Sequence, residues 1–343
     1  MRHLLNTLFV TSEDIYLSLD GENVVASREK EAVARYPLHT LTAILTFAYP
    51  GASPALMGAC ARRGISLSFC TPGGKFLARV TGEANGNVLL RRTQYRMADD
   101  PAQSCAIARA MVFGKVHNAR WSIERTRRDH GLRVDDQRWG EVSSQLKTML
   151  PQLLQETDLD SLRGLEGASA TAYFGVFDQM ILGDRSVFYF ETRSRRPPLD
   201  PVNALLSFAY SLLSHDCAGA LESVGLDSYV GFLHRDRPGR SSLALDLMEE
   251  FRPCMADRFV LTCINNRIFQ KTDFVFRENG GVLLSESGRR TFLQRWQERK
   301  KDSLTHPFLG EKVPWGLVPY LQALLLARCL RGDLEAYPPF LWK

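Results

Sequence analysis

The sequence lacks paired cysteines. Its seven cysteines are an odd number, they are widely scattered, and no two of them form a C-x-x-C pair. Disulfide frameworks and thiolate metal sites depend on more regular spacing. We therefore expect the cysteines to be reduced and mostly buried, in a cytoplasmic protein.

Long apolar segments are also missing. The longest apolar run, from Tyr320 to Ala327, is interrupted by Gln322 and is far too short to span a bilayer. The N-terminus shows no basic segment followed by an apolar one, which a secretory signal would require. We expect neither a membrane span nor a membrane partner.

Two common catalytic motifs do not occur. Because there is no H-E-x-x-H, a zinc peptidase is disfavoured. The segment Pro72-Gly73-Gly74 precedes Lys75 between two apolar runs, but it does not have P-loop spacing. It predicts a hairpin turn rather than a phosphate-binding loop.

The composition is that of an ordinary globular protein with room for two domains. Of the 343 residues, 45% are hydrophobic and 24% are charged. The 43 Lys and Arg against 38 Asp and Glu leave a net charge of only +5, which is weak evidence for a polyanionic partner. The positions of the arginines are more informative than their number.

Short strand-like segments dominate the first part of the chain. Asp20-Gly21 predicts a hairpin between two of them, and a helix from Pro54 to Arg63 should end at Gly64 as its C-cap. The expected strands are Leu4 to Val10, Ile15 to Leu19, Val24 to Ser27, Leu41 to Phe47, Ile65 to Phe69 and Phe76 to Val80.

The pattern becomes helical after Asp99-Asp100-Pro101 and stays so almost to the end of the chain. The expected helices are Ala102 to Asp129, Trp139 to Thr157, Leu159 to Met180, Pro201 to His215, Ala244 to Phe276, Ser287 to Lys301 and Trp315 to Leu330. We therefore predict an α+β protein with a small N-terminal β domain, residues 1–98, and a larger all-α domain, residues 99–343.

The stretch from Tyr229 to Pro253 holds most of the candidate chemistry. It contains His234, a basic turn and then a helix with three acids. Asp246, Glu249 and Glu250 stand on one face of that helix, because they are three and four positions apart. Such close carboxylates repel each other unless a positive group lies among them.

Each of these residues also has an ordinary structural explanation. His234 is either a hydrogen-bonded structural residue or a ligand of a mixed nitrogen and oxygen site, which suits Mn²⁺ or Mg²⁺. We assign Glu250 to the exposed polar stripe of an amphipathic helix. Three roles remain open for Asp246: a second ligand, a group that orients His234, or a group that positions a nucleophile.

Glu166 lies among small residues in the segment L-R-G-L-E-G-A-S-A-T-A-Y-F. The small residues allow either tight helix packing around a solvated acid or the close approach of a ligand to that acid. Tyr173 follows seven positions later and therefore lies on the same helical face.

Basic residues recur near these acids. Arginine binds phosphate oxygens in a bidentate manner, so repeated arginines favour contact with a nucleic-acid backbone over an ordinary solvated face, and such binding should weaken with salt. The clusters are Arg193, Arg195 and Arg196; Arg235, Arg237 and Arg240; and Arg289, Arg290, Arg295, Arg299, Lys300 and Lys301. A further basic helix face is predicted from Arg109, Lys115, Arg120, Arg125, Arg127 and Arg128.

Several segments together resemble one family, the CRISPR-associated adaptation integrases, in the form found in type I, subtype C systems. The matching segments are A-R-R-G-I-S-L-S-F-C-T-P-G-G-K, F-G-K-V-H-N-A-R, L-R-G-L-E-G-A-S-A, P-V-N-A-L-L-S-F-A-Y-S-L-L and S-L-A-L-D-L-M-E-E-F-R-P. In that family a glutamate, a histidine and an acid bind a divalent ion. By motif position the resemblance places these ligands at Glu166, His234 and Glu249, with Asp246 as the neighbouring acid. Some members have aspartate where this chain has Glu249.

The resemblance also implies an activity and partners. The expected activity is the joining of the 3′-hydroxyl ends of short duplex DNA to the leader-proximal CRISPR repeat, with Mg²⁺ or Mn²⁺. The expected assembly is a homodimer formed through the β domains, bound to a dimer of a small adaptation partner protein and to double-stranded DNA, with an accessory adaptation nuclease as a further candidate partner. Two alternatives stay open, a non-catalytic DNA-holding subunit and a general metal-dependent nuclease on branched DNA.

Overall fold

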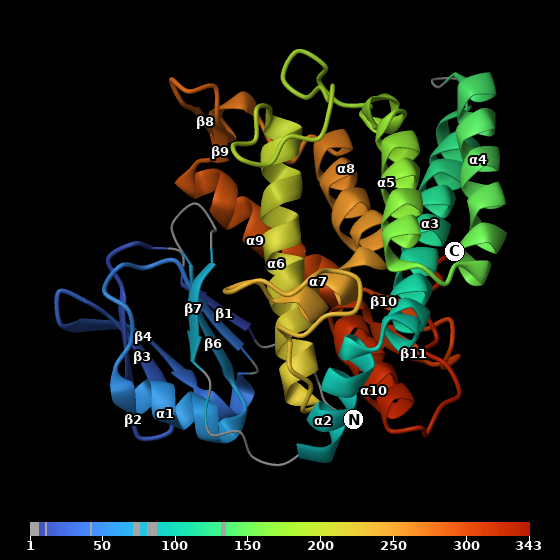
Figure 1. Ribbon diagram of the computed structural model, residues 1–343. Coiled ribbons are helices and arrows are strands. Elements are labelled where there is room, and N and C mark those ends of the chain that lie inside the picture. The colour runs from blue at the N-terminus through green and yellow to red at the C-terminus, as the bar shows by residue number, and fades with distance from the viewer. Residues whose placement is uncertain are drawn as a thin grey trace.

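The computed structural model describes residues 7–10, 12–41, 43–70, 76–80, 82, 88–131 and 135–343. The predicted turn at Pro72-Gly73-Gly74 and the start of the first predicted strand lie outside these ranges. Most strands lie in the N-terminal part of the chain and helices dominate the rest, which confirms the predicted α+β class (Figure 1).

The N-terminal part contains two sheets. The first has the order β1 (Thr7–Val10), β5 (Ala43–Thr46), β6 (Ser66–Cys70) and β7 (Phe76–Val80), in which only the β6–β7 pair is antiparallel. The second is an antiparallel meander of β2 (Tyr16–Asp20), β3 (Asn23–Arg28) and β4 (Glu31–Pro37). An apolar core that includes Leu17, Ile44 and Leu56 joins both sheets to helix α1.

The predicted hairpin and first helix are confirmed. Asp20 pairs with Asn23 across a two-residue turn, in which Gly21 takes a φ of +57°. Helix α1 spans Pro54–Arg63, and Gly64 follows it with a φ of +65°, the left-handed conformation that glycine adopts without steric cost. Strand β4 was not predicted, because it is polar and mostly exposed and so shows no apolar alternation.

Helices α3 to α10 largely follow the predicted pattern. Helix α6 is longer than predicted, and short 3-10 turns replace the end of one predicted helix and the start of another. The bounds are α3 (Pro101–His130), α4 (Asp136–Gln155), α5 (Leu159–Phe174), α6 (Pro201–Ser223), α7 (Ser242–Glu249), α8 (Arg258–Asn265), α9 (Glu286–Lys301) and α10 (Val318–Leu330).

Helix α2 (Val88–Asp99) was missed, and the prediction that the helical pattern starts only after Asp99 was wrong. This helix is short and polar, and only Leu90 and Gln94 are buried in it, so its sequence has almost no apolar period. The amide of Gln94 donates to the carbonyl oxygens of Asp227 and Val230, at 2.8 and 2.9 Å, and so anchors the loop that follows α6.

The single helix predicted from Ala244 to Phe276 was also wrong. Helix α7 ends at Glu249, a π-helical turn spans Arg252–Asp257, and α8 follows. Pro253 has no N–H to donate, which interrupts the regular hydrogen-bond ladder at this place. The predicted segment ends in strand β8 (Phe274–Phe276), which pairs with β9 (Val282–Leu284). A second unpredicted ribbon joins β10 (Ser303–Thr305) to β11 (Lys312–Pro314).

Helices α3, α4 and α5 pack against one another, while α6 contacts α7, α10 and β9 (Figure 1). The sheets lie beside α6 in the same view, and Arg79 of β7 forms a 2.5 Å ion pair with Glu222 of α6.

The six cysteines with described side chains are free thiols, five of them buried, as expected. None of the described helices is both long and apolar enough to cross a bilayer.

Candidate metal-binding active site

Two helices and one loop carry the candidate residues. Glu166 lies on α5, while Asp246 and Glu249 lie on α7 and His234 lies on the loop before α7. Helix α3 contacts both α5 and α7. The side chain of Asp158 accepts a hydrogen bond from Ser161 N and so defines the start of α5.

Lys115 of α3 connects the two glutamates. Its ammonium contacts Glu166 Oε1 and lies 2.7 Å from Glu249 Oε2. The distance between these two carboxylate oxygens therefore cannot exceed the sum of their two distances to the Lys115 nitrogen. The structure thus brings together Glu166 and Glu249, which are far apart in the sequence.

Lys115 was predicted to lie on a basic helix face, but the structure buries it between acids. Lys115 is only 8% exposed. The sequence contained a sign of this burial. Helical spacing places Lys115 on the same face as small or apolar residues that are all buried, namely Ala108, Val112, Ala119 and Ser122. A lysine on such a face indicates a buried partner of opposite charge.

Asp246 shapes the loop that holds His234. Its Oδ2 accepts hydrogen bonds from the backbone N–H groups of Phe232 and Leu233, at 2.6 and 2.9 Å. Its Oδ1 accepts one from His234 N at 3.0 Å and lies 2.5 Å from His234 Nδ1. Asp246 is fully buried, so among its three open roles these contacts support the orientation of the imidazole, with Nε2 directed away from it.

The close approach of the loop to α7 requires a glycine. A Cβ atom on Gly231 would lie 2.8 Å from Asp246 Oδ2 and 2.8 Å from Ser242 Cβ. Any larger residue would therefore push the loop away from the carboxylate that holds it.

Glu249 is buried among positive groups. It is 2% exposed, and its Oε1 lies 3.2 Å from Arg252 Nη2. Burial by itself would raise the pKa of Glu249, but the positive groups around it, above all Arg252 and Lys115, hold it well below its usual value. Glu249 is therefore a carboxylate at neutral pH and can act as an anionic ligand.

Glu250 is not on the surface, contrary to the prediction. It is fully buried and accepts hydrogen bonds from the Tyr337 hydroxyl, from Phe340 N at 2.5 Å and from Gln322 Nε2 at 3.3 Å. Burial raises its pKa to about 8, although these hydrogen bonds act in the opposite direction. The C-terminal segment covers this side of α7, a contact that the local sequence pattern could not show.

The predicted DNA-binding arginines fall into two groups. The guanidinium of Arg193 donates to Asn203 Oδ1 at 2.6 Å and stacks on Tyr210, and Arg289 is buried near Glu13, so both have partners within the protein. The remaining predicted residues are more accessible: Arg195, Arg196, Arg235, Arg237 and Arg290 are exposed and Arg240 is half-buried.

Two of the arginine clusters lie near each other. Burial lowers the pKa of Arg240, and the positive charges of Arg237, Arg195 and Arg196 add to this effect. The segments around residues 195 and 237 are therefore close enough for their charges to act on one side chain. We call Arg195, Arg196, Arg237 and Arg240 the arginine patch. Arg290 lies outside this patch and pairs with Glu286 on α9.

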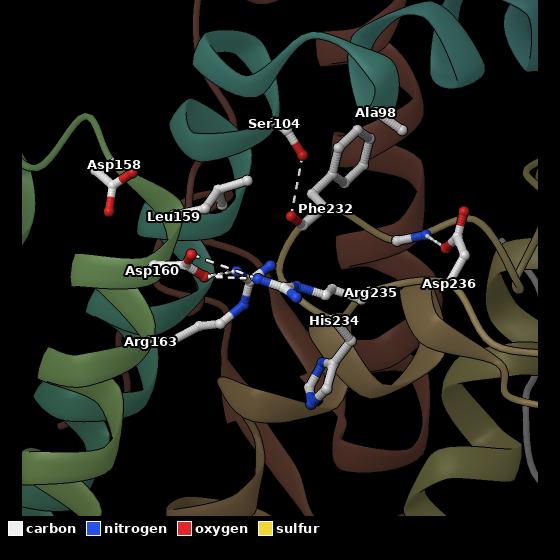
Figure 2. Close-up of a pocket in the computed structure, with 11 residues that line it drawn as sticks. Ala98, Ser104, Asp158, Leu159, Asp160, Arg163, Phe232, His234, Arg235 and Asp236 are labelled. Carbon is white, nitrogen blue, oxygen red and sulfur yellow. Dashed lines mark hydrogen bonds and ion pairs between the residues drawn. The ribbon is translucent and has the colours of Figure 1, made fainter.

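A cavity of about 360 Å³ opens beside His234 (Figure 2). Arg163, one turn before Glu166 on α5, donates to the carbonyl oxygen of Leu233 from Nε and Nη2, at 2.9 and 2.7 Å. Its third nitrogen contacts Asp160, which also lies 3.1 Å from Arg235, as Figure 2 shows. Arg163 therefore ties the helix of Glu166 to the loop of His234.

The donor set fits a hard divalent ion. Two carboxylates and one imidazole nitrogen suit Mg²⁺ or Mn²⁺ better than a thiolate-seeking metal. Buried Glu249 Oε2 makes no hydrogen bond of good geometry, although it pairs with Lys115. Within the described ranges, no three His, Cys, Asp or Glu side chains are grouped closely enough to hold a metal ion as they stand. The ammonium of Lys115 lies between the two carboxylates instead.

Comparison with solved structures shows the fold. The chain is similar to a casposase bound to its integration product, with a TM-score of 0.83 and 22% identity over 99% of this chain and 95% of the other. It is also similar to a chain of a Cas6-RT-Cas1–Cas2 complex, with a TM-score of 0.81 and 22% identity, covering all of this chain and 36% of that one.

Comparison of sequences shows the family. Residues 8–298 match the family model described as CRISPR associated protein Cas1. The chain is 51% identical, over the full length of both proteins, to a CRISPR-associated endonuclease Cas1 from Rhodospirillum rubrum. A helix-borne Glu166, a buried Glu249 and a loop-borne His234 thus occur in a chain that belongs to the CRISPR-associated protein Cas1 family.

Proposed function

We propose that this protein is a DNA integrase and endonuclease of CRISPR adaptation that requires a divalent ion. It joins the 3′-hydroxyl ends of short duplex DNA to the leader-proximal repeat by transesterification. One observation supports this proposal most strongly: the carboxylates of Glu166 and Glu249 converge on a single positive charge, although they come from different helices. A subunit that only holds DNA has no need for this arrangement.

Glu166, Glu249 and His234 would hold Mg²⁺ or Mn²⁺. When bound, such an ion lowers the pKa of an attacking hydroxyl and stabilises the charge that grows on the phosphate oxygens. Asp246 keeps the His234 ring oriented through Nδ1, and Arg252 keeps Glu249 ionised. In the proposed step a bond forms between the incoming 3′-oxygen and the phosphorus at the end of the repeat. The bond from that phosphorus to the 3′-oxygen of the flanking strand breaks, so the flanking strand leaves with a new 3′-hydroxyl. One phosphodiester replaces another, so no external energy source is needed.

The arginine patch would hold DNA. Its guanidinium groups can bind backbone phosphates without reading sequence. A basic surface formed by two segments that are distant in the chain suits a duplex that runs across the loop of His234. Arg193 and Arg289 would act indirectly, through the packing of the segments that they anchor.

The assembly is also part of the proposal. A homodimer formed through the N-terminal sheets would bind a dimer of the small adaptation partner, and the Cas6-RT-Cas1–Cas2 neighbour motivates this expectation. An accessory adaptation nuclease remains a candidate third component.

The test is an integration assay with purified protein, with and without the small partner. Labelled short duplex is incubated with a supercoiled repeat plasmid in Mn²⁺, and joined product is scored. Glu166→Ala, His234→Ala and Glu249→Ala should abolish the product but leave duplex binding nearly unchanged. Glu141→Ala, which removes an exposed carboxylate on α4, should behave like the unmodified protein.

Retained joining by Glu166→Ala would overturn the proposal. Cleavage of branched DNA without joined product would instead favour the alternative of a general metal-dependent nuclease, because water and a 3′-hydroxyl attack phosphorus through the same chemistry.

A further inference from the structure

The buried ammonium of Lys115 has two partners at the centre of the candidate site. It contacts Glu166 on one side and Glu249 on the other, and its side chain is only 10% exposed. Charged lysine is rarely buried unless it is paired. Its position between two carboxylates from different helices therefore has a clear electrostatic cause.

Without a positive charge, the two carboxylates would repel each other across a short, partly buried distance. Arg252 lies 3.2 Å from the other oxygen of Glu249 and its charge also acts on Glu166, but among the described residues its ion pair is with Glu249. Lys115 is the group that links Glu166 to Glu249, and its charge offsets the repulsion between the two carboxylates.

A divalent ion held by the same two carboxylates would compete directly with this ammonium. Two positive charges within about 4 Å repel each other by several kcal/mol at the effective dielectric constant of a partly buried site. The ammonium must therefore move away from at least one carboxylate before the ion binds well. A lysine can do so, because its charge lies at the end of a flexible four-carbon chain.

We propose that Lys115 is a resident cation that a divalent ion must displace, and that a DNA phosphate is the partner to which the displaced ammonium moves. This inference rests on the proposed function, since it places the reacting phosphate beside the ion. Metal binding and DNA binding are then coupled through one side chain. Each ligand raises the affinity for the other by the same factor.

The alternative is a purely structural ion pair. In that case loss of Lys115 would lower stability but would not increase the affinity for metal. The chain offers a matched control for this alternative. Lys300 is a second lysine that is 8% exposed, and it pairs with Asp216 at 2.9 Å, outside the candidate site.

The experiment is a Mn²⁺ titration of the full-length protein at a fixed pH of about 8, followed by the EPR signal of the free ion. Without DNA, Lys115→Met should bind Mn²⁺ at least about tenfold more tightly than the unmodified protein, because the competing charge is gone. Lys300→Met should bind with unchanged affinity. Glu166→Gln should lose the site.

The same titration is then repeated with a short duplex. DNA should increase the Mn²⁺ affinity of the unmodified protein and have a clearly smaller effect on Lys115→Met. Circular dichroism confirms that each variant is folded. If the methionine variant does not fold, Lys115→Gln provides the same removal of charge with a polar side chain.

The outcomes separate the two proposals. If Glu166→Gln loses the ion but neither Lys115 variant binds it more tightly, Lys115 is only a structural partner and the inference is wrong, while the proposed site stands. If Mn²⁺ binding does not depend on Glu166, the proposed site itself is wrong.

Discussion

Asp246 shows how much one side chain contributes to the candidate site. It is fully buried, and its hydrogen bonds to the described residues go to the backbone from Phe232 to His234 and to the His234 ring. A carboxylate in this position accepts hydrogen bonds from several N–H donors at once. The loop conformation and the ring orientation therefore depend on the same group.

Asp246→Asn should weaken metal binding by about ten- to a hundredfold, the usual effect of losing a group that orients a ligand. The asparagine amide directs a donor toward backbone N–H groups, so the loop and the imidazole lose their alignment. Mn²⁺ titration measures the affinity. Asp236→Asn, an exposed acid on the same loop, serves as the control. Unchanged Mn²⁺ affinity in Asp246→Asn would show that His234 needs no orienting partner.

Among the elements, the C-terminal segment supports the end of α7. Asn118 of α3 donates to the carbonyl oxygens of Glu250 and Phe340, at 2.6 and 2.8 Å, and accepts from Trp342 N. Glu250 accepts from Phe340 N. The end of the helix that carries Glu249 is therefore held both by α3 and by the C-terminal segment.

Phe340→Ala tests this support. The ring of Phe340 is fully buried and lies against Phe251 and Trp315, with ring centroids 5.8 and 6.0 Å apart. Its removal leaves a cavity, and we expect a loss of about 3 to 5 kcal/mol in the free energy of unfolding. Urea denaturation measures the loss, with the half-exposed Phe308→Ala as control. A change below about 1 kcal/mol would mean that the segment is not part of the core.

Elements with a strong period could be predicted from sequence, and elements without one could not. Helix α1 matches its prediction in both bounds, because proline begins it and glycine ends it. Helix α2 and strand β4 were missed, because their polar sequences are ordered by neighbours rather than by an apolar stripe. The break after α7 was missed because Leu243, Leu247 and Phe251 continue a helical period up to the π-helical turn.

At the scale of the whole molecule, buried histidines should link stability to pH. His215 lies within α6, and burial lowers its pKa from 6.5 to about 4. A histidine that is neutral in the folded protein gains its proton more readily in the unfolded chain. The contribution of His215 to the free energy of unfolding is therefore fully present above about pH 6.5 and is lost as the pH falls toward 4.

His215→Asn should flatten this dependence. The variant removes a contribution of up to about 3 kcal/mol between pH 6.5 and pH 4, calculated from about 1.4 kcal/mol per pKa unit. Unfolding by urea at a series of pH values measures the slope, and the exposed His39→Asn is the control. An identical slope in His215→Asn and the unmodified protein would contradict the assigned pKa.

The sequence alone determined the α+β class, the family resemblance and the residues proposed as ligands. These depend on local features, namely the apolar period, turn residues and motif spacing, which are present in the chain before it folds. Glu166, His234 and Glu249 could be named in this way, but their mutual distances could not.

The tertiary structure decided which charges meet. Lys115 and Glu250 were both assigned to exposed faces, and both are buried because segments distant in the sequence cover them, α5 and α7 in one case and the C-terminal segment in the other. A charge becomes buried only when long-range packing removes its water and supplies a partner of opposite charge or a set of hydrogen bonds. Local sequence describes the residue itself but not the distant segment that packs against it.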